Sequence, residues 1–564
     1  MARTVAIGHQ DFEHVVINNY FYVDKTNFIR EWWEKGDAVT LITRPRRFGK
    51  TLNMSMLELF FSVEYEKRSD LFENLKIWEY DEYRELQGTY PVISLTFAGV
   101  KEVDFSNARK KLCQNIRVLY NKYDFLLQGD LLNEEEKQYF RSISAEMEDY
   151  IASDSLKNLS LYLKRYYGKK VIILLDEYDT PMQEAYVNGY WEELTAFYRN
   201  LFHAAFKTNP YLERALMTGI TRISKESVFS DLNNLEVVTT TSEAYETSFG
   251  FTEEEVFDAL EEYGLSEKKE LVKKWYDGFV FGKTEDIYNP WSIINFLDKR
   301  KEGAYWANTS SNSLVGKLMR EGNRQIKLDF ERLISGETFV SEIDEQIVFS
   351  QLDSSECAVW SLLLASGYLK TIACRKVSVG LDWKLQYELK LTNFEVLTMF
   401  RRMVREWFGQ SNADYNDFLK AMLLGDVDAM NEYMNRVALA TFSYFDTGSG
   451  SGKQEEPERF YHGFVLGLMV DLAGKYRITS NRESGFGRYD VILKPLQKSD
   501  PAVIMEFKVR NRRKEKTLED TAENALKQIE EKRYQEVLLE EGILEENILK
   551  YGFAFQGKKV LIES

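Results

Sequence analysis

The sequence predicts an α/β protein with a parallel sheet at its N-terminus, a mainly helical middle region and a smaller α/β domain at its C-terminus. Three observations predict it. Apolar strand-like segments alternate with helical segments up to about residue 245. The residues that follow, to about 446, have mainly the helical period. The polar stretch TGSGSGKQEEPE then precedes further strand-like segments that contain charged residues.

Length and apolar content predict several globular domains. The chain has 564 residues, of which 44% are hydrophobic, so it is too long for one core and apolar enough for large ones. We expect five stretches: an α/β domain at 1–245, a helical lid-like domain at 246–335, a helical or winged-helix-like region at 336–446, a flexible linker at 447–458 and an α/β domain at 459–564.

Charge and cysteine content limit the function classes. With 73 basic and 90 acidic residues the formal charge is −17, so any polyanion must meet a local basic surface. Cys113, Cys357 and Cys374 are dispersed and lack zinc or disulfide spacing, which indicates a reducing compartment. The N-terminus turns polar early, and no apolar run approaches about 18 residues. We therefore expect a soluble cytoplasmic protein without a membrane segment.

The N-terminal segments alternate in the order of a parallel sheet with helices on both faces. DAVTLIT is a strand, and TLNMSMLELFFSV after it is a helix. Further strands are expected at 89–97, 170–180 and 213–223, with a long helix between the first two and WEELTAFYRNLFHAAF before the last. Near the start, Thr26 is expected to cap the helix NFIREWWEK.

Between the first strand and its helix lies RPRRFGKT, residues 44–51. Gly49-Lys50-Thr51 keeps the end of the phosphate-binding pattern G-x-x-x-x-G-K-[ST], but Arg44 replaces its first glycine and Pro45 fixes the backbone beside it. The alternative is a turn that binds nothing. If the loop binds a nucleotide, its backbone N–H groups, lysine and hydroxyl contact the phosphates and Mg²⁺. The expected contacts are Arg46, Arg47, Phe48, Gly49, Lys50 and Thr51.

The strand VIILLDEYD supplies the carboxylates that such a site needs. Asp176 is expected to hold Mg²⁺ together with Thr51, and Glu177 to polarise an attacking water. The alternative is that both carboxylates only end and solubilise a strand. Thr218 or Thr221 is a candidate polar sensor for the γ-phosphate, or a structural strand end. Arg222, like the loop arginines, is a candidate for phosphate or subunit contact, or an ordinary surface residue.

The middle of the chain reads as helices with one strand pair. FTEEEVFDALEEYG has a candidate cap at Thr252, and NPWSIINFL begins behind Asn289-Pro290. Later, the helix SECAVWSLLLASGYL, the strands KTIACRKV and WKLQYELKL, and the helix NFEVLTMFRRMVREWF follow in the order of a winged helix. Many small α+β units share that order.

Two adjacent strands near the C-terminus, GRYDVILKP and AVIMEFKVR, contain Asp490, Glu506 and Lys508. Because side chains alternate along a strand, Glu506 and Lys508 share a face. If Asp490 faces them, the carboxylates can hold Mg²⁺ or Mn²⁺ and the lysine can orient water or offset phosphate charge, which is chemistry for phosphodiester hydrolysis. The alternative is a charged pair on a strand edge. Against it, a buried Glu and Lys are costly unless paired or bound to metal.

The sequence resembles a bacterial family of AAA-ATPase-like proteins that combine an N-terminal P-loop domain with a C-terminal PD-(D/E)XK nuclease-like domain. The resembling segments are YFYVDKTNFI, LITRPRRFGKTLNMSMLELFF, VIILLDEYDTP, LMTGITRISKESVFSDLNNL, WYDGFVFG, IYNPWSIINFL and YWANTS. The resemblance implies a P-loop NTPase fold with a helical lid, ATP and Mg²⁺ as cofactors, and Arg44 as a variant that the family itself has.

In the C-terminal part, the resemblance implies roles for further residues. Gln528 and Tyr534 are similar to the glutamine and tyrosine often found on the second main helix of PD-(D/E)XK nucleases. Glu458 matches an additional metal-side carboxylate, or a charge at a helix start; His462 is its neighbour, or a semi-buried histidine. Tyr489 stands where the pattern has proline. The run KVRNRRKEK, 508–516, is a basic surface for nucleic acid or a solvated loop.

The sequence is consistent with three functions. The first is an ATPase coupled to a metal-dependent nuclease that acts on DNA or RNA. The second is a nucleotide-switched regulatory or interaction protein whose C-terminal domain binds without cutting. The third is a P-loop scaffold with neither activity. Intact loop and carboxylate residues favour the first, and assembly into a homo-oligomer is open. The sequence does not distinguish DNA from RNA.

Overall fold

The computed structural model of the chain contains two compact units. The first comprises Met1–Leu314 and Gly336–Leu397, and the second comprises Val315–Ser335 and Thr398–Ser564. The structure describes residues 2–221, 229, 232–307, 315–316, 318–319, 324–344, 352, 355–379, 382–406, 412–445, 472, 475–480, 483–484, 487–488, 490–497, 499–510, 515–556 and 559–564. The domain boundaries expected at 245, 335, 446 and 458 stay predictions.

A five-stranded parallel sheet forms the base of the first unit, as the alternating segments predicted. Its strands lie in the order β2-β3-β4-β1-β5, with every pair parallel. Their bounds are β1 Val39–Thr43, β2 Val92–Thr96, β3 Val171–Asp176, β4 Leu212–Gly219 and β5 Leu235–Val238. Every residue of β1 and β3 is buried, because helices cover both faces of the sheet.

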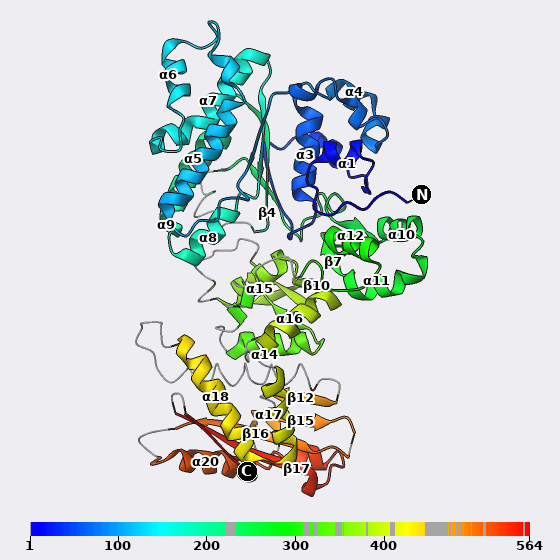
Figure 1. Ribbon diagram of the computed structural model, residues 1–564, viewed down its shortest axis with the longest axis vertical. Helices are drawn as coiled ribbons and strands as arrows, with labels where there is room; N and C mark the ends of the chain where they lie inside the picture. Colours follow the sequence, from blue (N-terminus) through cyan, green and yellow to red (C-terminus); the bar gives the residue numbers. More distant parts are fainter. Residues whose placement is uncertain are drawn as a thin grey trace. The chain divides into compact units, whose positions relative to one another are not determined.

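The helices divide between the two faces of this sheet. In Figure 1, α5, α7 and α9 lie on one side of it, and α1, α3 and α4 lie on the other. The helices of this part are α1 Phe12–Ile17, α2 Asn27–Lys35, α3 Lys50–Phe61, α4 Asp81–Leu86, α5 Phe105–Asn121, α6 Glu134–Ser142, α7 Asp149–Tyr167, α8 Thr180–Asn188 and α9 Trp191–Phe202. The strand-loop-helix order β1-α3 puts Gly49-Lys50-Thr51 at a helix N-terminus beside the carboxyl end of the sheet.

Thr26 occupies the expected cap position of α2, but the expected capping hydrogen bond from its side chain is absent. The Thr26 hydroxyl donates to Asp24 at 2.6 Å and accepts from the backbone N–H of Ile77 at 3.1 Å. Asp24 also accepts the backbone N–H groups of Thr26 and Lys76. Asp24 and a long-range partner therefore take the hydroxyl that local sequence assigned to the helix.

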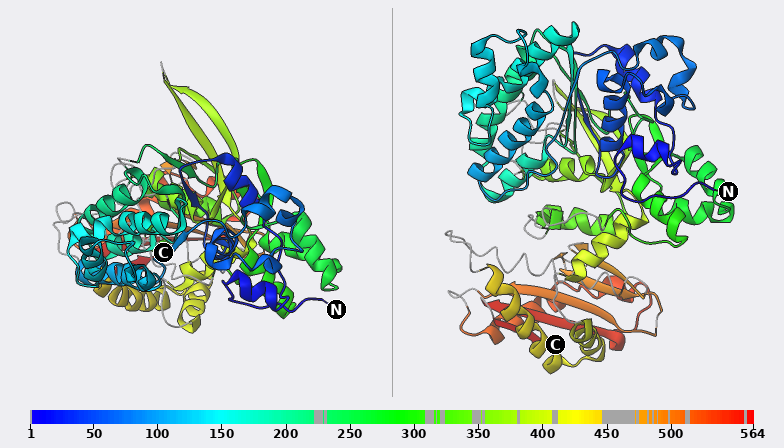
Figure 2. Two further views of the ribbon diagram at one scale, coloured as in Figure 1. Left: turned by 90° about the horizontal axis from the view of Figure 1, so that it is seen from above. Right: turned by 45° about the horizontal axis from the view of Figure 1, so that its top comes forward.

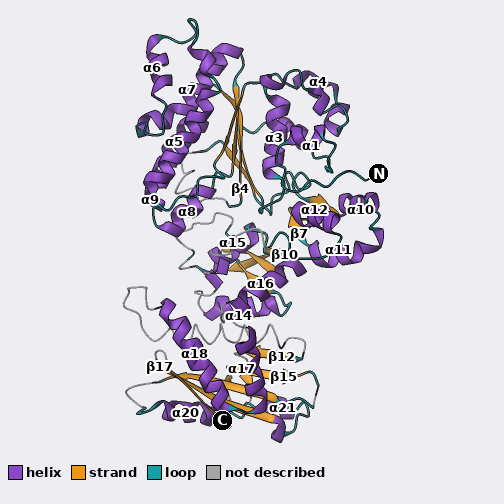
Figure 3. Cartoon of the chain, viewed as in Figure 1, coloured by secondary structure: helices purple, strands orange, loops and turns teal. Residues whose placement is uncertain are grey.

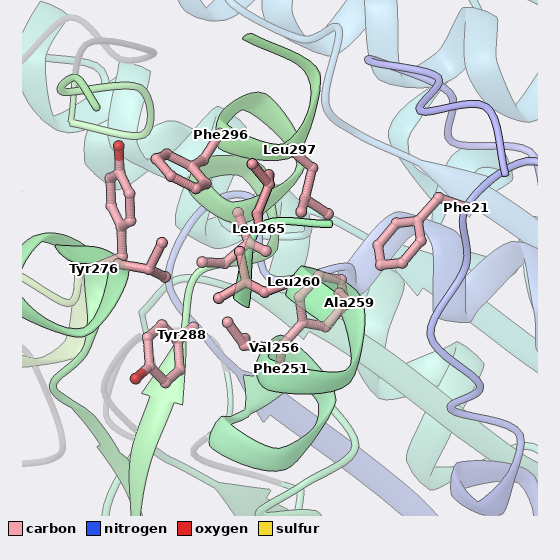
Figure 4. Close-up of a cluster of buried hydrophobic side chains, with 12 residues drawn as sticks. Phe21, Phe251, Val256, Ala259, Leu260, Leu265, Tyr276, Tyr288, Phe296 and Leu297 are labelled. Carbon is pink, nitrogen blue, oxygen red and sulfur yellow. The ribbon is translucent and has the colours of Figure 1, made fainter. Parts of the chain in front are cut away.

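A helical part with its own core follows the sheet in the first unit. Its elements are β6 Phe251–Thr252, α10 Glu253–Glu262, α11 Lys269–Tyr276, β7 Phe279–Phe281, β8 Thr284–Tyr288 and α12 Pro290–Lys299. Thr252 and Glu255 form a capping box at the start of α10, as the sequence indicated. The small antiparallel sheet β6-β8-β7 was not expected. Figure 4 shows how Phe21, from the N-terminal segment, joins the buried cluster of this part.

The last part of the first unit contains a three-stranded antiparallel sheet in the order β10-β11-β9. Its elements are β9 Phe339–Ser341, α15 Glu356–Ala365, β10 Leu369–Val379, β11 Asp382–Leu391 and the beginning of α16 Phe394–Glu406. The expected order of helix, strand pair and helix is present. Helix α15 is buried along nearly its whole length, and Trp360 packs on Phe339 of β9.

The second unit contains a five-stranded mixed sheet and several helices (Figure 3). Its strands lie in the order β12-β15-β16-β17-β18, with β16 and β17 parallel and the other pairs antiparallel. Their bounds are β12 Tyr476–Ser480, β15 Val491–Pro495, β16 Ala502–Val509, β17 Ile548–Gln556 and β18 Lys559–Glu563; β13 Glu483–Ser484 and β14 Gly487–Arg488 form a separate pair. The helices are α14 Arg324–Ile334, α17 Asn412–Leu424, α18 Val427–Phe445, α20 Leu518–Glu531 and α21 Glu536–Leu539. Helix α20 packs on β16 and β17, and α18 packs on β18.

Candidate functional sites

The loop after β1 has the backbone form of a phosphate site. Gly49 precedes α3 with a φ of 84°, in the left-handed region that glycine adopts without strain. Lys50, buried to 5% exposure, bends back so that its ammonium donates to the carbonyl oxygens of Arg44 at 2.9 Å and Pro45 at 2.8 Å. Burial lowers its pKa, against the opposing effect of the nearby carboxylates Glu177 and Asp176. Two uncharged carbonyl oxygens therefore hold the Lys50 ammonium at the N-terminus of α3.

Arg44 anchors the base of the loop. The side chain is fully buried, and its guanidinium donates to the carbonyl oxygens of Thr43 at 3.0 Å and of Thr239, after β5, at 2.6 Å. Its Cζ lies 4.6 Å from the ring centre of Phe281. Burial lowers the Arg44 pKa to about 9. Because its φ is not positive, the position needs no glycine, and the arginine ties the loop to the strand beyond it.

The three loop residues between Pro45 and Gly49 point in different directions. Arg46 is exposed, and its guanidinium donates to Gln183 at 3.3 Å. Arg47 has a φ of 64°, and its guanidinium lies 4.4 Å from the ring centre of Trp291 in α12. Phe48 is buried between Phe279 and Phe281, so only its backbone is left to contact a ligand. Nucleotide contact by these residues stays a prediction.

Asp176 and Glu177 lie at the carboxyl end of β3, beside the loop. Asp176 accepts the Thr51 hydroxyl at 2.6 Å and also accepts the Thr218 hydroxyl. Burial raises the Asp176 pKa, while these two bonds oppose the rise. Glu177 has a φ of 50° and accepts the Thr180 hydroxyl at 3.1 Å. The hydroxyl and carboxylate expected to share Mg²⁺ are therefore in direct contact.

Asp179 is a functional candidate that the sequence reasoning missed. It is fully buried and accepts the backbone N–H groups of Ile220 at 3.0 Å and Thr221 at 2.9 Å, and the Thr221 hydroxyl at 2.9 Å. Gly219 must stay a glycine, because an added Cβ would lie 2.8 Å from Asp179 and 2.7 Å from Tyr178. Asp179 thus ties the end of β4 to the end of β3. A third carboxylate in DEYD was the available signal.

The two candidate sensor threonines have different partners. The hydroxyl of Thr218 contacts Asp176, whereas that of Thr221 contacts Asp179. The geometry therefore favours Thr218 as the polar group beside the predicted Mg²⁺ ligand. Arg222 lies outside the described residues.

Donors from later in the first unit also hold the loop. Asn289, which caps α12, donates to the carbonyl oxygen of Arg46 at 3.3 Å, and the Trp306 indole donates to the same oxygen at 3.0 Å. Glu395 in α16 fixes this segment by accepting the backbone N–H of Trp306 at 2.6 Å and the Ser292 hydroxyl at 2.7 Å. Burial raises the Glu395 pKa to about 7. Sequence spacing gave no signal for these contacts.

In the second unit, β15, β16 and α20 bring the other predicted site together. Glu506 is 4% exposed, and its Oε1 accepts the amide of Gln528, which also donates to the Tyr534 hydroxyl at 3.0 Å. The Lys508 ammonium donates to the Gln528 carbonyl oxygen at 2.5 Å. Asp490, just before β15, accepts the backbone N–H of Phe507 at 2.9 Å. The structure thus joins four predicted residues in one hydrogen-bonded group, and Asp490 bonds the backbone beside Glu506 and Lys508.

The electrostatics of this group fit a divalent cation. The Glu506 pKa is raised to about 8, mainly by burial and then by the charge of Asp490, with Lys508 opposing. The Oε2 atom of Glu506 is buried without a hydrogen-bond partner. Such an atom costs free energy unless a proton or a metal ion meets it. Asp490 and Glu506 therefore fit the ligand set that the sequence predicted.

Several predicted residues lie outside the described part of the chain: Glu458, His462 and Tyr489. Of the basic run 508–516, Arg510 is tied to Gln556 at 2.6 Å. Within the described ranges, one further acidic group lies in the first unit, where Glu253, Asp277 and Asp286 place ligand atoms within 4.8 Å of one another. Lys273 pairs with Glu253 and with Asp286 at 3.7 Å, so this group has an internal counter-charge.

No helix in the part of the chain that the structure describes is both long and apolar enough to cross a membrane. A protein of Azotobacter chroococcum mcd 1, described as "Uncharacterized protein in vnfD 5'region", is 25% identical over 409 residues, which cover 70% of each chain. Two family models match this sequence, a predicted AAA-ATPase at residues 6–229 and the PD-(D/E)XK nuclease superfamily at residues 456–564. The chain therefore matches an AAA-ATPase-like family model in its N-terminal part and a PD-(D/E)XK nuclease superfamily model in its C-terminal part.

Proposed function

We propose that the protein binds and hydrolyses ATP in its first unit and that this activity is coupled to metal-dependent cleavage of DNA or RNA phosphodiesters by its second unit. The family matches support the general assignment to ATPase and nuclease-like function. The observation that supports the finer proposal is the buried, unpartnered Oε2 of Glu506 beside Asp490 and Lys508. Such a buried oxygen costs free energy, and a bound metal ion would remove that cost.

In the first unit, the geometry supports a role in ATP hydrolysis for residues of the loop and of the neighbouring strand ends. The N–H groups at the start of α3 favour a phosphate, and the Lys50 ammonium exchanges two neutral carbonyl acceptors for phosphate oxygens. Thr51 and Asp176 would hold Mg²⁺. Glu177, at its left-handed position, orients the attacking water, while Thr218 fixes the Asp176 carboxylate.

In the second unit, Asp490 and Glu506 would hold Mg²⁺ or Mn²⁺, which supplies an activated water and polarises the phosphate when bound. Lys508 offsets the charge that develops on the phosphate oxygens. Gln528 holds both Glu506 and Lys508, so it sets the distance between the carboxylate and the ammonium. Tyr534 in turn fixes the Gln528 amide.

A second candidate is a nucleotide-switched protein whose second unit binds nucleic acid without cutting it. The observation that favours it is the anchored loop. Arg44, buried and bound to carbonyl groups of Thr43 and Thr239, fixes the loop at its base. A loop held in one position suits long retention of a nucleotide better than rapid exchange.

The test measures both activities in the full chain. ATP hydrolysis with Mg²⁺ is expected in the wild type, and loss is expected in Lys50→Ala and Glu177→Gln, each assayed with and without DNA and RNA. Cleavage of DNA or RNA in Mg²⁺ or Mn²⁺ is expected to vanish in Asp490→Ala but not in Asp500→Ala, a carboxylate elsewhere in the same unit. Tight ATP binding without turnover, together with nucleic-acid binding without cleavage, would instead support the switch.

A further inference from the structure

The strands β10 and β11 form a long two-stranded ribbon in the first unit. In the left view of Figure 2, these strands extend beyond the other elements of that unit. They pair without interruption from Ala373 opposite Glu388 to Val379 opposite Asp382. At the base of the ribbon Leu389 is fully buried, whereas farther out Leu385 is 39% and Trp383 is 51% exposed.

One face of the ribbon is buried near its base and exposed toward its tip. Residues opposite one another in an antiparallel pair share a face, so Cys374, Lys376, Trp383 and Leu385 lie on the same side as the buried Tyr387. The Lys376 ammonium lies 3.9 Å from the ring centre of Trp383. A large apolar side chain with a cation over its ring therefore stands exposed on a narrow ribbon.

The ribbon is basic in an acidic protein. The formal charge of the chain is −17, yet basic residues exceed acidic ones between 369 and 391. The basic residues are Lys370, Arg375, Lys376, Lys384 and Lys390, and the acidic ones are Asp382 and Glu388. Arg375 keeps 77% of its side chain exposed and Lys384 keeps 52%, although Glu388 lies 3.9 Å from the first and Glu342 lies 3.0 Å from the second. Such exposed pairs are weak, so a phosphate can replace the carboxylate.

We propose that this ribbon binds double-stranded DNA. A two-stranded ribbon fits the major groove of B-form DNA, whereas the A-form major groove of RNA is too narrow to admit one. Arg375 and Lys384, on the opposite face to Trp383, reach phosphates along the groove wall, while Lys376, Trp383 and Leu385 face its interior. The inference rests on the proposed action on nucleic acid, and it names the substrate class and a binding surface in the first unit.

Binding is tested with a fluorescein-labelled 20-base-pair duplex and the full chain, by fluorescence anisotropy in EDTA without nucleotide. The triple variant Arg375→Ala, Lys376→Ala, Lys384→Ala is expected to bind about tenfold or more weakly at moderate salt. The slope of log affinity on log salt is expected to flatten by roughly 2 to 3, because each neutralised phosphate contributes about 0.9. These side chains are exposed, so the variant is expected to keep the melting temperature of the wild type.

The matched control is Arg84→Ala, Lys101→Ala, Lys283→Ala, which removes the same charges from exposed positions elsewhere in the first unit. It is expected to bind the duplex as the wild type does. Equal losses in both triple variants, or no loss in the ribbon variant, would overturn the proposal. So would a ribbon variant that loses only single-stranded DNA or RNA. Because no ATP or metal is present, a chain without either enzymatic activity gives the same readout, so the two proposals fail separately.

A footprint on a natural thiol tests the placement. Cys374 is exposed on the ribbon, Cys113 is buried and Cys357 is half-buried. In Cys357→Ser, the duplex is expected to slow alkylation of Cys374 by N-ethylmaleimide several-fold, while a single-stranded RNA of equal length leaves the rate unchanged. An unchanged rate with bound duplex would contradict contact at this face. Concentration-dependent self-association that Trp383→Ala abolishes, with DNA binding intact, would assign the ribbon to a second copy instead.

Discussion

Glu506 is the residue whose ionisation links the metal chemistry of the second unit to its stability. Its pKa is about 8 in the folded chain because of burial and the nearby Asp490. The ordinary value of a glutamate is near 4.3. Between these two values the folded state binds the extra proton and the unfolded state does not, so the free energy of unfolding falls as the pH rises. A metal ion that displaces the proton reverses this loss.

We therefore expect the metal-free second unit to melt at a lower temperature at pH 8.5 than at pH 5. The drop is expected to exceed that of Glu506→Gln by on the order of 5 °C. The stabilisation by Mn²⁺ is expected to grow over the same interval, because the carboxylate must be ionised to bind the ion. Differential scanning calorimetry across pH measures both effects. Equal pH dependence in the wild type and Glu506→Gln would show that another group is responsible.

Thr218 and Thr221 differ in partner, so the same substitution at each has a different expected effect. Thr218→Val removes the hydroxyl that fixes Asp176, and we expect kcat for ATP to fall roughly tenfold, about 1.4 kcal/mol of transition-state stabilisation. Thr221→Val removes a hydroxyl bound to Asp179, whose two backbone bonds remain, so we expect a smaller change in kcat. Steady-state kinetics of both variants checks this, and a larger loss in Thr221→Val would reverse the sensor assignment.

At the scale of elements, α18 closes the edge of the second sheet. Asn431 accepts the backbone N–H of Ile562 at 2.8 Å and donates to its carbonyl oxygen at 2.9 Å. Asn435, one helical turn on, bonds Val560 in the same way at 3.0 and 2.8 Å. Two amides thus pair with β18 as a neighbouring strand would. An open edge strand is a template for aggregation, and this helix covers it.

We expect Asn431→Ala, Asn435→Ala to lower the unfolding free energy of the second unit by about 2 to 4 kcal/mol, since four hydrogen bonds of about 1 kcal/mol each are lost. Aggregation on heating should also begin earlier. Denaturant unfolding and light scattering measure the two effects. Asn524→Ala, which removes an exposed amide bonded to Glu515, is the control and should change little. No difference from that control would mean that packing alone holds α18 on the sheet.

The hydrogen bonds that Asn289 and Trp306 donate to the Arg46 carbonyl oxygen are a second link between elements. Trp306→Phe removes the indole donor to the Arg46 carbonyl but keeps a ring beside Phe279 and Tyr368. We expect ATP affinity to fall about fivefold, because one hydrogen bond that holds the loop is lost. Isothermal titration measures it. Trp360→Phe, which changes a buried indole far along the same unit, should leave ATP affinity unchanged; an equal loss there would indicate general loosening.

At the scale of the whole molecule, regular features were predictable from the sequence and long-range contacts were not. The parallel strands, the helix after Gly49 and the cap at Thr252 follow from local periodicity and local hydrogen bonding. The Thr26 cap failed because the neighbouring Asp24 accepts its hydroxyl and Ile77, from a distant segment, donates to it. Strand alternation places Glu506 and Lys508 on one face, and the packing of α20 on β16 brings Gln528 to them. The contacts of this site were therefore predictable, with Asp490 just before the neighbouring strand. The contacts of Asn289, Trp306 and Glu395 depend on backbone groups far along the chain, which no residue pattern displays, whereas the third carboxylate of DEYD was a local signal for Asp179.

The division into two units leads to a prediction about how each ligand stabilises the chain. A ligand that binds only the folded state stabilises the unit that contains its site by about 2.7 kcal/mol at a hundred times its dissociation constant. ATP added at constant Mg²⁺ is expected to raise the melting temperature of the first unit, and Mn²⁺ without nucleotide is expected to raise that of the second. Lys50→Ala should abolish only the shift by ATP, and Glu506→Gln only the shift by Mn²⁺.

The pattern of shifts separates independent units from coupled ones. If the units unfold independently, two calorimetric transitions appear and each ligand moves one of them. If ATP also moves the transition of the second unit, and Lys50→Ala abolishes both shifts, nucleotide binding must change the free energy of that unit. If ATP also changes the affinity for Mn²⁺, linkage requires Mn²⁺ to change the affinity for ATP by the same factor, which titration of ATP with and without Mn²⁺ in Glu506→Gln and in the wild type measures. A shift of the second transition that persists in Lys50→Ala would instead place a nucleotide on the second unit itself.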